Sequence, residues 1–509
     1  MKSSKLLAPV ALALIAMCAS LASTAEAAST AAITTNAKTK GDITFTSSKA
    51  GVTPFIANAK FSGTAIAKLT SVVYTIAAQP GAKAAPVKVK YSAAALQSRG
   101  DIGANALTLP VFGLYAGVTN PVSVVFNFKD GTSQTLAVSL KAAAYTDPKK
   151  VYDRPVKLTP RSDAVLGFNY LYMKSGLGSP VIVDTDGAVR WVGPTVDSSF
   201  SSTYDNGVFM IGVHSTAGLI NMQMDGSMQE FPLDDPTIAW FNHNMVKGRE
   251  AYLTGVDWTS PDGVVQVQSK IAEMTMQGHV VREWDFAQII GDYMTAHGDD
   301  PTQFIHPGLN WLHINSSLYD PSDDSLVISS REQFVMKVDY DTGAIKWILG
   351  DPTKWWHSFA SLRAKQITLP AGSEYPIGQH GINIEPSGAL LLFNNGAPSQ
   401  GLPDGEPIGQ SQPFSTVNAY TIDPATMTGK EVFRYTHNKT LKANVCGSAW
   451  EGATPSMIID YASADNDNHV HLVGLDADGN IALEYVYNNQ SCGTAWHTVP
   501  IPFENLTIN

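Results

Sequence analysis

From about residue 180 onward, the chain repeats one pattern of apolar and polar positions. A short apolar or alternating run leads into a turn dipeptide, and a second run follows that carries an aromatic or large apolar residue. The first runs occupy residues 181–183, 219–224, 271–276, 335–340, 419–422 and 470–475. The turns are Asp186-Gly187, Asp225-Gly226, Gln277-Gly278, Thr342-Gly343, Thr428-Gly429 and Asp478-Gly479, and the residues after them are Trp191, Phe231, Trp284, Trp347, Phe433 and Leu483. Each copy is typical of a β-hairpin, because a half-buried strand alternates with a period of two.

Six such hairpins predict a repeat architecture. Their spacing runs from roughly 40 to 85 residues, and the longer intervals leave room for loops. Periodic units of about four strands favour an all-β fold, a six-bladed β-propeller, over residues 148–509. An open sandwich or a different number of blades is the alternative. We expect the apolar tail at residues 498–506 to complete one blade across the two ends of the chain.

The residues before the repeats have a different composition. Residues 32–145 are rich in Ala, Thr, Val and Ser and contain no His, Cys or Trp. Short alternating runs at 42–46 and 122–128 are separated by turn residues such as Asp130-Gly131. This pattern predicts a small antiparallel β-sandwich over residues 28–147, with residues 147–150 as the linker.

Residues 1–27 have the pattern of a secretory signal peptide. Lys2 and Lys5 precede an apolar stretch that ends at Cys18, and the Ala25-Glu26-Ala27 site follows. A lipid-anchored start at Cys18 is the alternative. The rest of the sequence contains no stretch of about 20 apolar residues, the length that is needed to span a bilayer. The formal net charge of −11 argues against nucleic acid and anionic membranes as partners.

Export makes one disulfide the simplest state of the two remaining cysteines, Cys446 and Cys492, with two free buried thiols as the alternative. Closing a loop of this length contributes roughly 4 kcal/mol on the chain-entropy model.

Three histidines occupy the same position of successive repeats. They lie in residues 241–245 (FNHNM), 311–316 (WLHINS) and 378–383 (GQHGIN), each at the start of an apolar run. The first strand of every propeller blade lines the central channel, so His243, His313 and His380 should meet at one depth. Arg331 ends the second strand of the fourth blade and returns to the level of His313. Asn315 lies two residues past His313 and points the same way.

This set of side chains favours binding of an oxyanion. The guanidinium of Arg can donate hydrogen bonds to two oxygens at once, and the side chains of His and Asn supply further hydrogen-bond donors. A metal site is the alternative, because three imidazoles can hold zinc or copper. A nearby guanidinium and the lack of an acidic residue in the three motifs weigh against it, and histidines that only cap backbone groups are the other alternative. His469 and His471 are expected to be structural, and His297, His306 and His357 lie in loops within reach of the channel. Most of the nearby aromatic residues are expected in the core: Trp240, Phe241, Phe304, Trp311, Trp355, Trp356 and Phe359.

Residues 311–316, 319–321, 324–331 (DSLVISSR) and 348–350 (ILG) resemble the signature of bacterial aryl sulfotransferases, periplasmic enzymes that need no activated nucleotide sulfate. Residues 379–381 (QHG) with 393–396 (FNNG) are similar to the family's nucleophile segment. Residues 241–243 are similar to its third-blade histidine motif, where the family more often has a second histidine in place of Asn242. Some enterobacterial members of the family carry a short-range cysteine pair just upstream of the nucleophile, whereas this chain has no cysteine between Ala28 and His380.

The resemblance implies ping-pong transfer of a sulfuryl group from a phenolic sulfate to another phenol. His380 is then the nucleophile, His243 is the acid/base, and Arg331, His313 and Asn315 stabilise the sulfuryl group. It implies small-molecule aryl sulfates and phenols as partners, no cofactor, no metal and a periplasmic location. The oligomeric state is left open, a homodimer included. The rival hypotheses are a propeller that only binds an anionic or glycan ligand, and a metal-dependent propeller enzyme.

Overall fold

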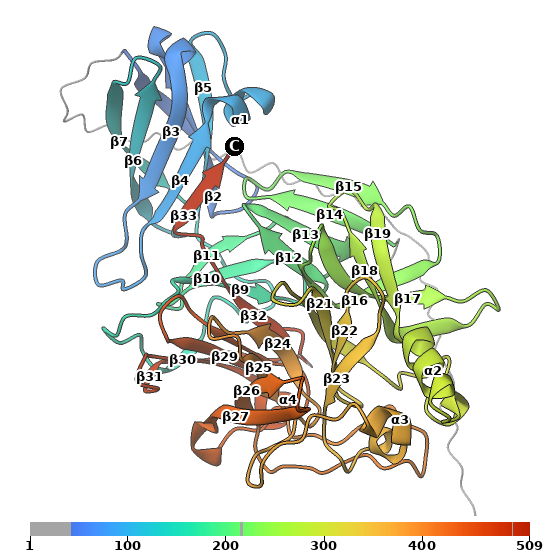
Figure 1. Cartoon of the computed structure of the whole chain (residues 1–509). Coiled ribbons are helices and arrows are strands. Elements are labelled where there is room, and N and C mark those ends of the chain that lie inside the picture. The colour runs from blue at the N-terminus through green and yellow to red at the C-terminus, as the bar shows by residue number, and fades with distance from the viewer. Residues whose placement is uncertain (1–41, 214–216, 491) are drawn as a thin grey trace, which may run out of the picture.

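The computed structural model describes residues 42–213, 217–490 and 492–509. The predicted signal peptide lies outside these residues. Two bodies are seen in Figure 1: a small β-sandwich at the top and a larger ring of sheets below it. Among the described residues, no helix has the length and apolar character of a membrane span.

The ring consists of six sheets, which confirms the prediction of a six-bladed propeller. The first blade comprises β32 (His497–Ile501), β9 (Tyr170–Lys174), β10 (Val181–Asp184) and β11 (Val189–Val192), and the second β12 (Ser202–Asp205), β13 (Val208–Val213), β14 (Gly218–Gln223) and β15 (Met228–Pro232). The third comprises β16 (Ile238–Lys247), β17 (Tyr252–Thr259), β18 (Val265–Met274) and β19 (Val280–Asp285), and the fourth β20 (Ile314–Asp320), β21 (Ser325–Ser330), β22 (Val335–Asp339) and β23 (Ile345–Leu349). The fifth comprises β24 (His380–Ile384), β25 (Leu390–Asn394), β26 (Thr416–Asp423) and β27 (Thr428–Tyr435). The sixth comprises β28 (Ser448–Glu451), β29 (Met457–Ser463), β30 (His469–Leu475) and β31 (Ile481–Asn488), with β8 (Val156–Thr159) on its outer edge. The first strand of each blade lies innermost, and these strands contact one another in chain order from β12 to β32.

The sandwich packs a three-stranded sheet against a five-stranded one. The first contains β1 (Thr44–Ala50), β2 (Ile56–Ser62) and β5 (Ala106–Phe112). The second contains β33 (Asn505–Ile508), β4 (Val87–Ser92), β3 (Leu69–Ile76), β6 (Thr119–Phe128) and β7 (Ser133–Lys141). Alternate residues of β6, among them Val122, Val124 and Phe126, face the core, as the period of two predicts.

The C-terminal tail divides between the two bodies. The strand β32 completes the first blade beside β9, as expected, but β33 leaves the propeller and pairs in parallel with β4 of the sandwich. The reason is apolar burial: Phe503 stacks on Phe112 with ring centroids 5.9 Å apart and contacts Tyr170 at 5.1 Å. One apolar core therefore continues from the sandwich into the first blade.

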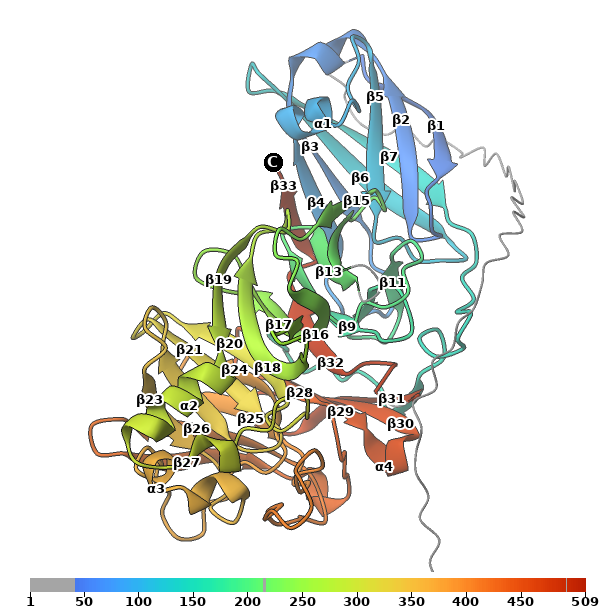
Figure 2. The same cartoon turned by 90° about the vertical axis from the view of Figure 1, so that its right-hand side faces the viewer.

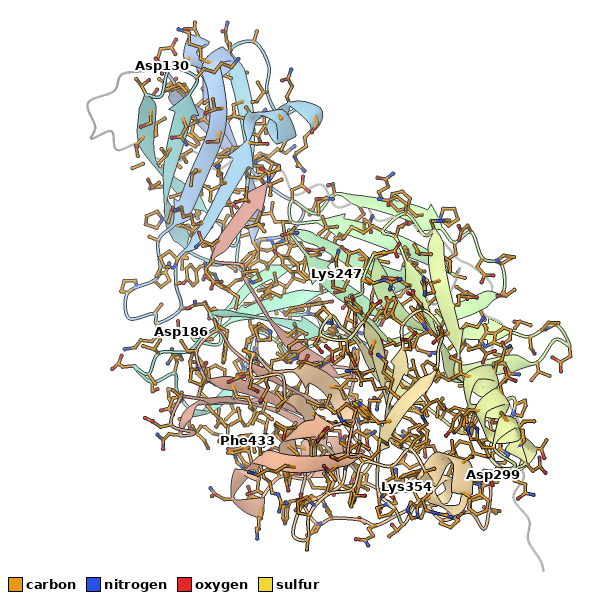
Figure 3. The ribbon with its side chains drawn as sticks, viewed as in Figure 1. Asp130, Asp186, Lys247, Asp299, Lys354 and Phe433 are labelled. Atoms are coloured by element: carbon orange, nitrogen blue, oxygen red, sulfur yellow. A yellow bond between two sulfur atoms is a disulfide. The ribbon has the colours of Figure 1, made fainter. Side chains whose placement is uncertain are left out.

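Helices are few and short: α1 (Ala93–Ser98), α2 (Phe286–Ala296), α3 (Ala360–Arg363) and α4 (Ala464–Asp467), with 3₁₀ turns η1 (Thr64–Lys68), η2 (Pro301–Gln303), η3 (Trp355–Ser358) and η4 (His437–Lys439). The helices α2 and α3 belong to the long connections that lead into β20 and β24. Both lie at the end of the molecule away from the sandwich, as Figure 2 also shows. Asp299, labelled in Figure 3, joins the two connections by accepting hydrogen bonds from the backbone N–H and hydroxyl of Ser361 at 2.7 and 2.5 Å.

Candidate active site

The three predicted histidines lie in adjacent blades, and strand pairing brings Arg331 beside one of them. His380 is the first residue of β24, His313 directly precedes β20, and His243 lies in an irregular part of β16. The rings of His243 and His313 are 5.2 Å apart. The backbone N–H of Arg331 donates to the carbonyl of His313 at 3.1 Å, because β21 returns antiparallel to β20. His313 has a φ of 48°, a costly conformation of the kind found at functional sites.

His380 is held as a neutral imidazole in one tautomer. Its Nδ1 lies 2.7 Å from Oδ1 of Asn395 and 3.2 Å from the carbonyl of Gly378, and both oxygens are acceptors, so Nδ1 carries the proton. The backbone N–H of Cys446 donates to Nε2 at 3.2 Å, which marks Nε2 as the nitrogen with the lone pair. Burial, helped by the positive charge of Arg331, lowers the pKa of His380 to about 3.

Asn395 fixes this arrangement. Its Nδ2 donates to the carbonyls of Ala443 and Cys446 at 2.9 and 2.8 Å, which orients Oδ1 toward His380. Cys446 forms the expected disulfide with Cys492. The N–H of Gly447 then donates to the carbonyl of Trp496 at 3.0 Å. The disulfide therefore ties together two segments, of which one touches the imidazole of His380.

Amide side chains link His313 and His243. Nδ2 of Asn310 donates to Nδ1 of His313 at 2.7 Å and to Oε1 of Gln268 at 3.0 Å. His313 consequently carries its proton on Nε2. Gln268 lies in the irregular part of β18 with a φ of 47°, and its Nε2 is 3.5 Å from Nδ1 of His243 and 3.3 Å from Oδ1 of Asn242. Burial, together with the charge of Arg331, holds the pKa of His313 well below its ordinary value.

A buried carboxylate orients Arg331. Oε1 of Glu332 accepts a hydrogen bond from Nε of Arg331 at 2.6 Å and another from Nη2. Oε2 of Glu332 accepts from the backbone N–H groups of Gln400 and Gly401 at 2.6 and 3.1 Å. Lys354, labelled in Figure 3, donates to the carbonyls of Arg331 and Glu332. Among the described residues, Nη1 of Arg331 takes part in no hydrogen bond, so this edge of the guanidinium is available to a ligand.

Asn315 contacts the backbone next to His380. It is fully buried, and its Nδ2 donates to the carbonyl of Gln379 at 2.8 Å. Gln379 in turn donates to the carbonyls of Ser330 and Phe334 at 2.8 and 3.1 Å. Asn315 therefore helps to hold β24 against β20, and this contact gives it a positioning role beside the one that the sequence predicted.

The sequence did not point to four residues from the first two blades and their entry segments. The rings of Phe200 and Trp496 lie 4.8 and 5.6 Å from that of His243. His497 heads β32 as His380 heads β24, and both of its nitrogens are buried without a hydrogen-bond partner among the described residues. Its cross-strand partner Lys174 is buried, donates to the carbonyl of Met245 at 3.2 Å, and has its pKa lowered by burial to about 7.

The remaining loop histidines make structural contacts. His297 bonds the carbonyl of Tyr293, His306 pairs with Glu406, and His357 contacts Gln366. Of the aromatic residues expected in the core, Phe241, Phe304, Trp311, Trp356 and Phe359 are buried, whereas Trp240 is 42% exposed.

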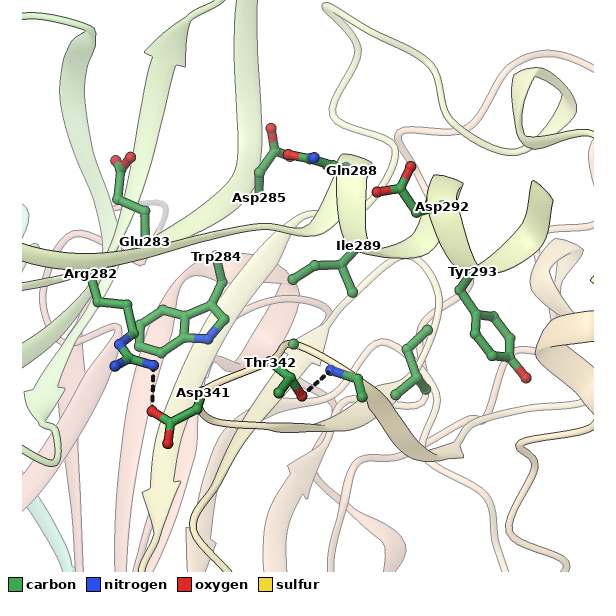
Figure 4. Close-up of a pocket in the computed structure, with 13 residues that line it drawn as sticks. Arg282, Glu283, Trp284, Asp285, Gln288, Ile289, Asp292, Tyr293, Asp341 and Thr342 are labelled. Carbon is green, nitrogen blue, oxygen red and sulfur yellow. Dashed lines mark hydrogen bonds and ion pairs between the residues drawn. The ribbon is translucent and has the colours of Figure 1, made fainter. Parts of the chain in front are cut away.

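A cavity of about 580 Å³ lies elsewhere, between the outer strand β19, the start of α2 and the turn at residues 341–345 (Figure 4). Arg282 and Asp341 form an ion pair across it at 2.6 Å. None of the predicted site residues lines this cavity. This cavity is therefore separate from the group of predicted site residues.

Comparison with known proteins places the chain in one family. Residues 161–494 match the family described as arylsulfotransferase (ASST), and residues 44–143 match an arylsulfotransferase Ig-like domain. An arylsulfate sulfotransferase AssT of Escherichia coli O6:H1 is 27% identical over 214 residues, which cover 34% of this chain and 35% of the relative. An arylsulfate sulfotransferase AssT of Lelliottia amnigena is 27% identical over 322 residues, which cover 50% of this chain and 52% of the relative. The chain thus spans between a third and about half of the length of these two relatives.

Proposed function

The chain belongs to the arylsulfotransferase family, and on this premise we propose that it transfers a sulfuryl group from an aryl sulfate to a phenol through a sulfated His380. The single observation that carries the proposal is the state of His380. It is a neutral imidazole with its proton fixed on Nδ1, so Nε2 has the lone pair that a nucleophile requires. Export to the periplasm through residues 1–27, and small aryl sulfates and phenols as partners, belong to the same proposal.

In the first half-reaction, Nε2 of His380 attacks the sulfur of the donor. An N–S bond forms while the bond between sulfur and the phenol oxygen breaks, and its electron pair leaves on that oxygen. A protonated His243 gives its proton to this oxygen, and the phenol departs. The sulfated ring keeps its Nδ1–H on Asn395, which stabilises the positive charge that the ring acquires.

In the second half-reaction, an acceptor phenol gives its proton to neutral His243 while its oxygen attacks sulfur. The N–S bond breaks, its electron pair returns to Nε2, and the starting protonation of His243 is restored. Two moderate displacements replace one difficult transfer.

Three donors converge on the sulfuryl oxygens in this proposal. Nη1 of Arg331 offers a fixed charge, Nε2–H of His313 offers a neutral donor, and the N–H of Cys446 faces an oxygen once Nε2 bears the sulfuryl group. Sulfuryl transfer, like phosphoryl transfer, passes through a loose transition state, so positioned charge and donors supply most of the catalysis. Phe200 and Trp496 form an aromatic wall beside His243 that suits a phenol ring.

The test is turnover of a chromogenic aryl sulfate with and without an added phenol. We expect slow cleavage alone, much faster cleavage with phenol, and one sulfuryl mass on the peptide that contains His380 when donor is added alone. His380→Ala should abolish both, whereas the control His279→Ala, at an exposed histidine that pairs with Asp234 on an outer turn, should change neither.

Three results would contradict the proposal. Equal rates with and without phenol would indicate a sulfatase, and an adduct on another residue would overturn the role of His380. Binding of the aryl sulfate without cleavage would favour the propeller that only binds an anionic ligand.

A further inference from the structure

A second group of histidines and carboxylates lies on the sixth blade, outside the proposed active site. It surrounds the turn between β29 and β30 that contains α4. Asp465, His469 and His471 each offer one metal-ligating atom, and these atoms all lie within 4.8 Å of one another. Oδ2 of Asp465 lies 2.9 Å from Nδ1 of His469 and 3.0 Å from Nε2 of His471. Two imidazoles and one carboxylate therefore converge on a single point.

The second nitrogen of His471 is held by another carboxylate. Its Nδ1 lies 3.1 Å from Oε1 of Glu484, whose side chain is only 9% exposed. Nε2 of His437 lies 3.4 Å from the same oxygen. A metal-binding histidine commonly donates its other N–H to such a carboxylate, which fixes its tautomer and orients its ring.

The access of solvent to the group also suits an ion. The side chains of Asp465 and His469 are 46% and 39% exposed, whereas that of His471 is 8% exposed. An ion can reach the group from solvent and complete its coordination with water. Asp465 stands in a turn whose residues 465–467 have φ values of 52°, 57° and 66°, a left-handed run that Asp and Asn adopt at lower cost than other residues except glycine. An ion bound to Asp465 would offset part of that cost.

We propose that Asp465, His469 and His471 bind one divalent cation of the zinc class, with Glu484 as the outer carboxylate that orients His471. Imidazole nitrogen ligands favour zinc over calcium and magnesium, which prefer oxygen ligands only. This inference departs from the sequence-based expectation that the chain holds no metal, and it makes His469 and His471 metal ligands where the sequence predicted only a structural role for them. It does not depend on the proposed transfer reaction, because none of these residues belongs to the group around His380.

The expected role is structural. The hydroxyl of Ser463, just before the turn, donates to the carbonyl of Val445 at 2.6 Å, and the N–H of Val445 donates back to it at 3.2 Å. Val445 precedes Cys446, whose N–H contacts His380. A cation would thus fasten the turn of the sixth blade that supports this loop.

The test uses the whole protein without a histidine tag, loaded with zinc chloride and dialysed. We expect about one zinc ion per chain by elemental analysis and a higher melting temperature than in the chelator-treated protein. Cobalt(II) in place of zinc should give the visible absorption of a four-coordinate site.

Variants identify the ligands. Asp465→Asn keeps a residue that tolerates the left-handed turn and His469→Gln changes a half-exposed side chain, so both should fold normally and lose the zinc. Glu484→Gln should weaken zinc affinity by about 10-fold to 100-fold. The control His279→Gln, at a histidine that also pairs with a carboxylate, should retain it. A wild-type protein that binds no zinc, or a zinc content unchanged in Asp465→Asn and His469→Gln, would overturn the proposal.

Discussion

The amide of Asn395 offers the sharpest test of the neutral nucleophile. Asn395→Asp replaces a neutral acceptor of the Nδ1 proton of His380, 2.7 Å away, by an anion of nearly the same shape. Nε2 attacks only when the ring is neutral, and burial with the charge of Arg331 lowers the pKa of His380 to about 3. We therefore expect wild-type adduct formation to be insensitive to pH from 8 down to 5, when the donor is the sulfate of a strongly acidic phenol that leaves without a proton.

The magnitude follows from Coulomb's law. A unit charge about 4 Å from the charge of the imidazolium contributes about 4 kcal/mol at an effective dielectric constant of about 20. At 1.36 kcal/mol per pKa unit this is roughly three units, which moves the pKa of His380 to near 6. The variant should form adduct at a rate that falls about tenfold between pH 8 and pH 5, because at pH 5 only about a tenth of the rings are neutral.

The assay is single-turnover sulfation of His380 followed by mass spectrometry across this pH range. The control is Asn221→Asp, at an asparagine of β14 that bonds the carbonyl of Met276 and is remote from the site. It should reproduce the flat wild-type profile. The Asn395→Asp variant also loses the hydrogen bonds that Nδ2 donates to the carbonyls of Ala443 and Cys446. This loss lowers the rate equally at every pH, so only a new pH dependence of the rate reports the effect of the negative charge. An Asn395→Asp profile parallel to that of the wild type would refute the argument.

Four further outcomes follow from the contacts. Arg331→Ala should slow sulfation by every donor by about 10²-fold or more, since a charged donor at the transition state is lost. Single-turnover rates with matched donors compare it with the control Lys346→Ala, at a lysine of β23 that pairs with Asp323, and an equal loss in the control would show that the effect is not specific to the site. His243→Ala should lower the rate of sulfation only slightly with sulfates of strongly acidic phenols and severely with sulfates of weakly acidic phenols. An identical loss of rate across phenols of graded pKa would make His313 the better candidate for the acid/base. Reduction of Cys446–Cys492 should lower the free energy of unfolding by roughly 4 kcal/mol in denaturant titration and slow sulfation, whereas unchanged sulfation would separate the disulfide from the Cys446 amide. Acid should destabilise the fold: His313, His380 and His497 have pKa values below the ordinary value of about 6.5, so the unfolded chain binds more protons, and melting temperature should fall as pH drops from 6.5 toward 5.

The blades were predictable from the sequence because each is a local unit. A period of two, a turn dipeptide and an aromatic residue recur in the outer hairpin of each blade without reference to distant segments, and the first strand of a blade is expected to lie innermost. That rule is enough to bring His313 and His380 to one end of the channel. The position of Arg331 beside His313 was predictable for the same reason, because β21 runs antiparallel to β20 and ends at the level where β20 begins.

The contributions of the first blade were missed because they depend on pairing between the two ends of the chain. Lys174 and His497 become cross-strand partners only when β32 joins β9. The predicted tail began at residue 498, one position after His497, although His497 heads its strand as His380 does. Gln268 left no signal, because its φ of 47° arises from an irregularity in the pairing of β17 and β18. Glu332 follows Arg331 directly, but no pattern in the sequence indicates that its carboxylate is buried.

The arrangement of these residues around the axis explains how one site could serve two half-reactions. Blades four to six and their connections supply His313, Arg331, His380 and the N–H of Cys446, which all act on the sulfuryl group in the proposed reaction. The segments that enter blades one and two supply Trp496 and Phe200, whose rings lie beside that of His243 in β16, and in the proposed reaction these three residues face the phenol. The sulfuryl group then stays fixed on one side of the channel while two different phenols occupy the other side in turn. This separation of the sulfuryl side from the phenol side requires that His380 be held without help from Phe200 and Trp496. The hydrogen bonds of Asn395 with His380 and with the carbonyl of Cys446 hold the imidazole in this way. The disulfide is the exception, because it joins the loop of Cys446 to the segment that carries Trp496, and so it couples the two sides.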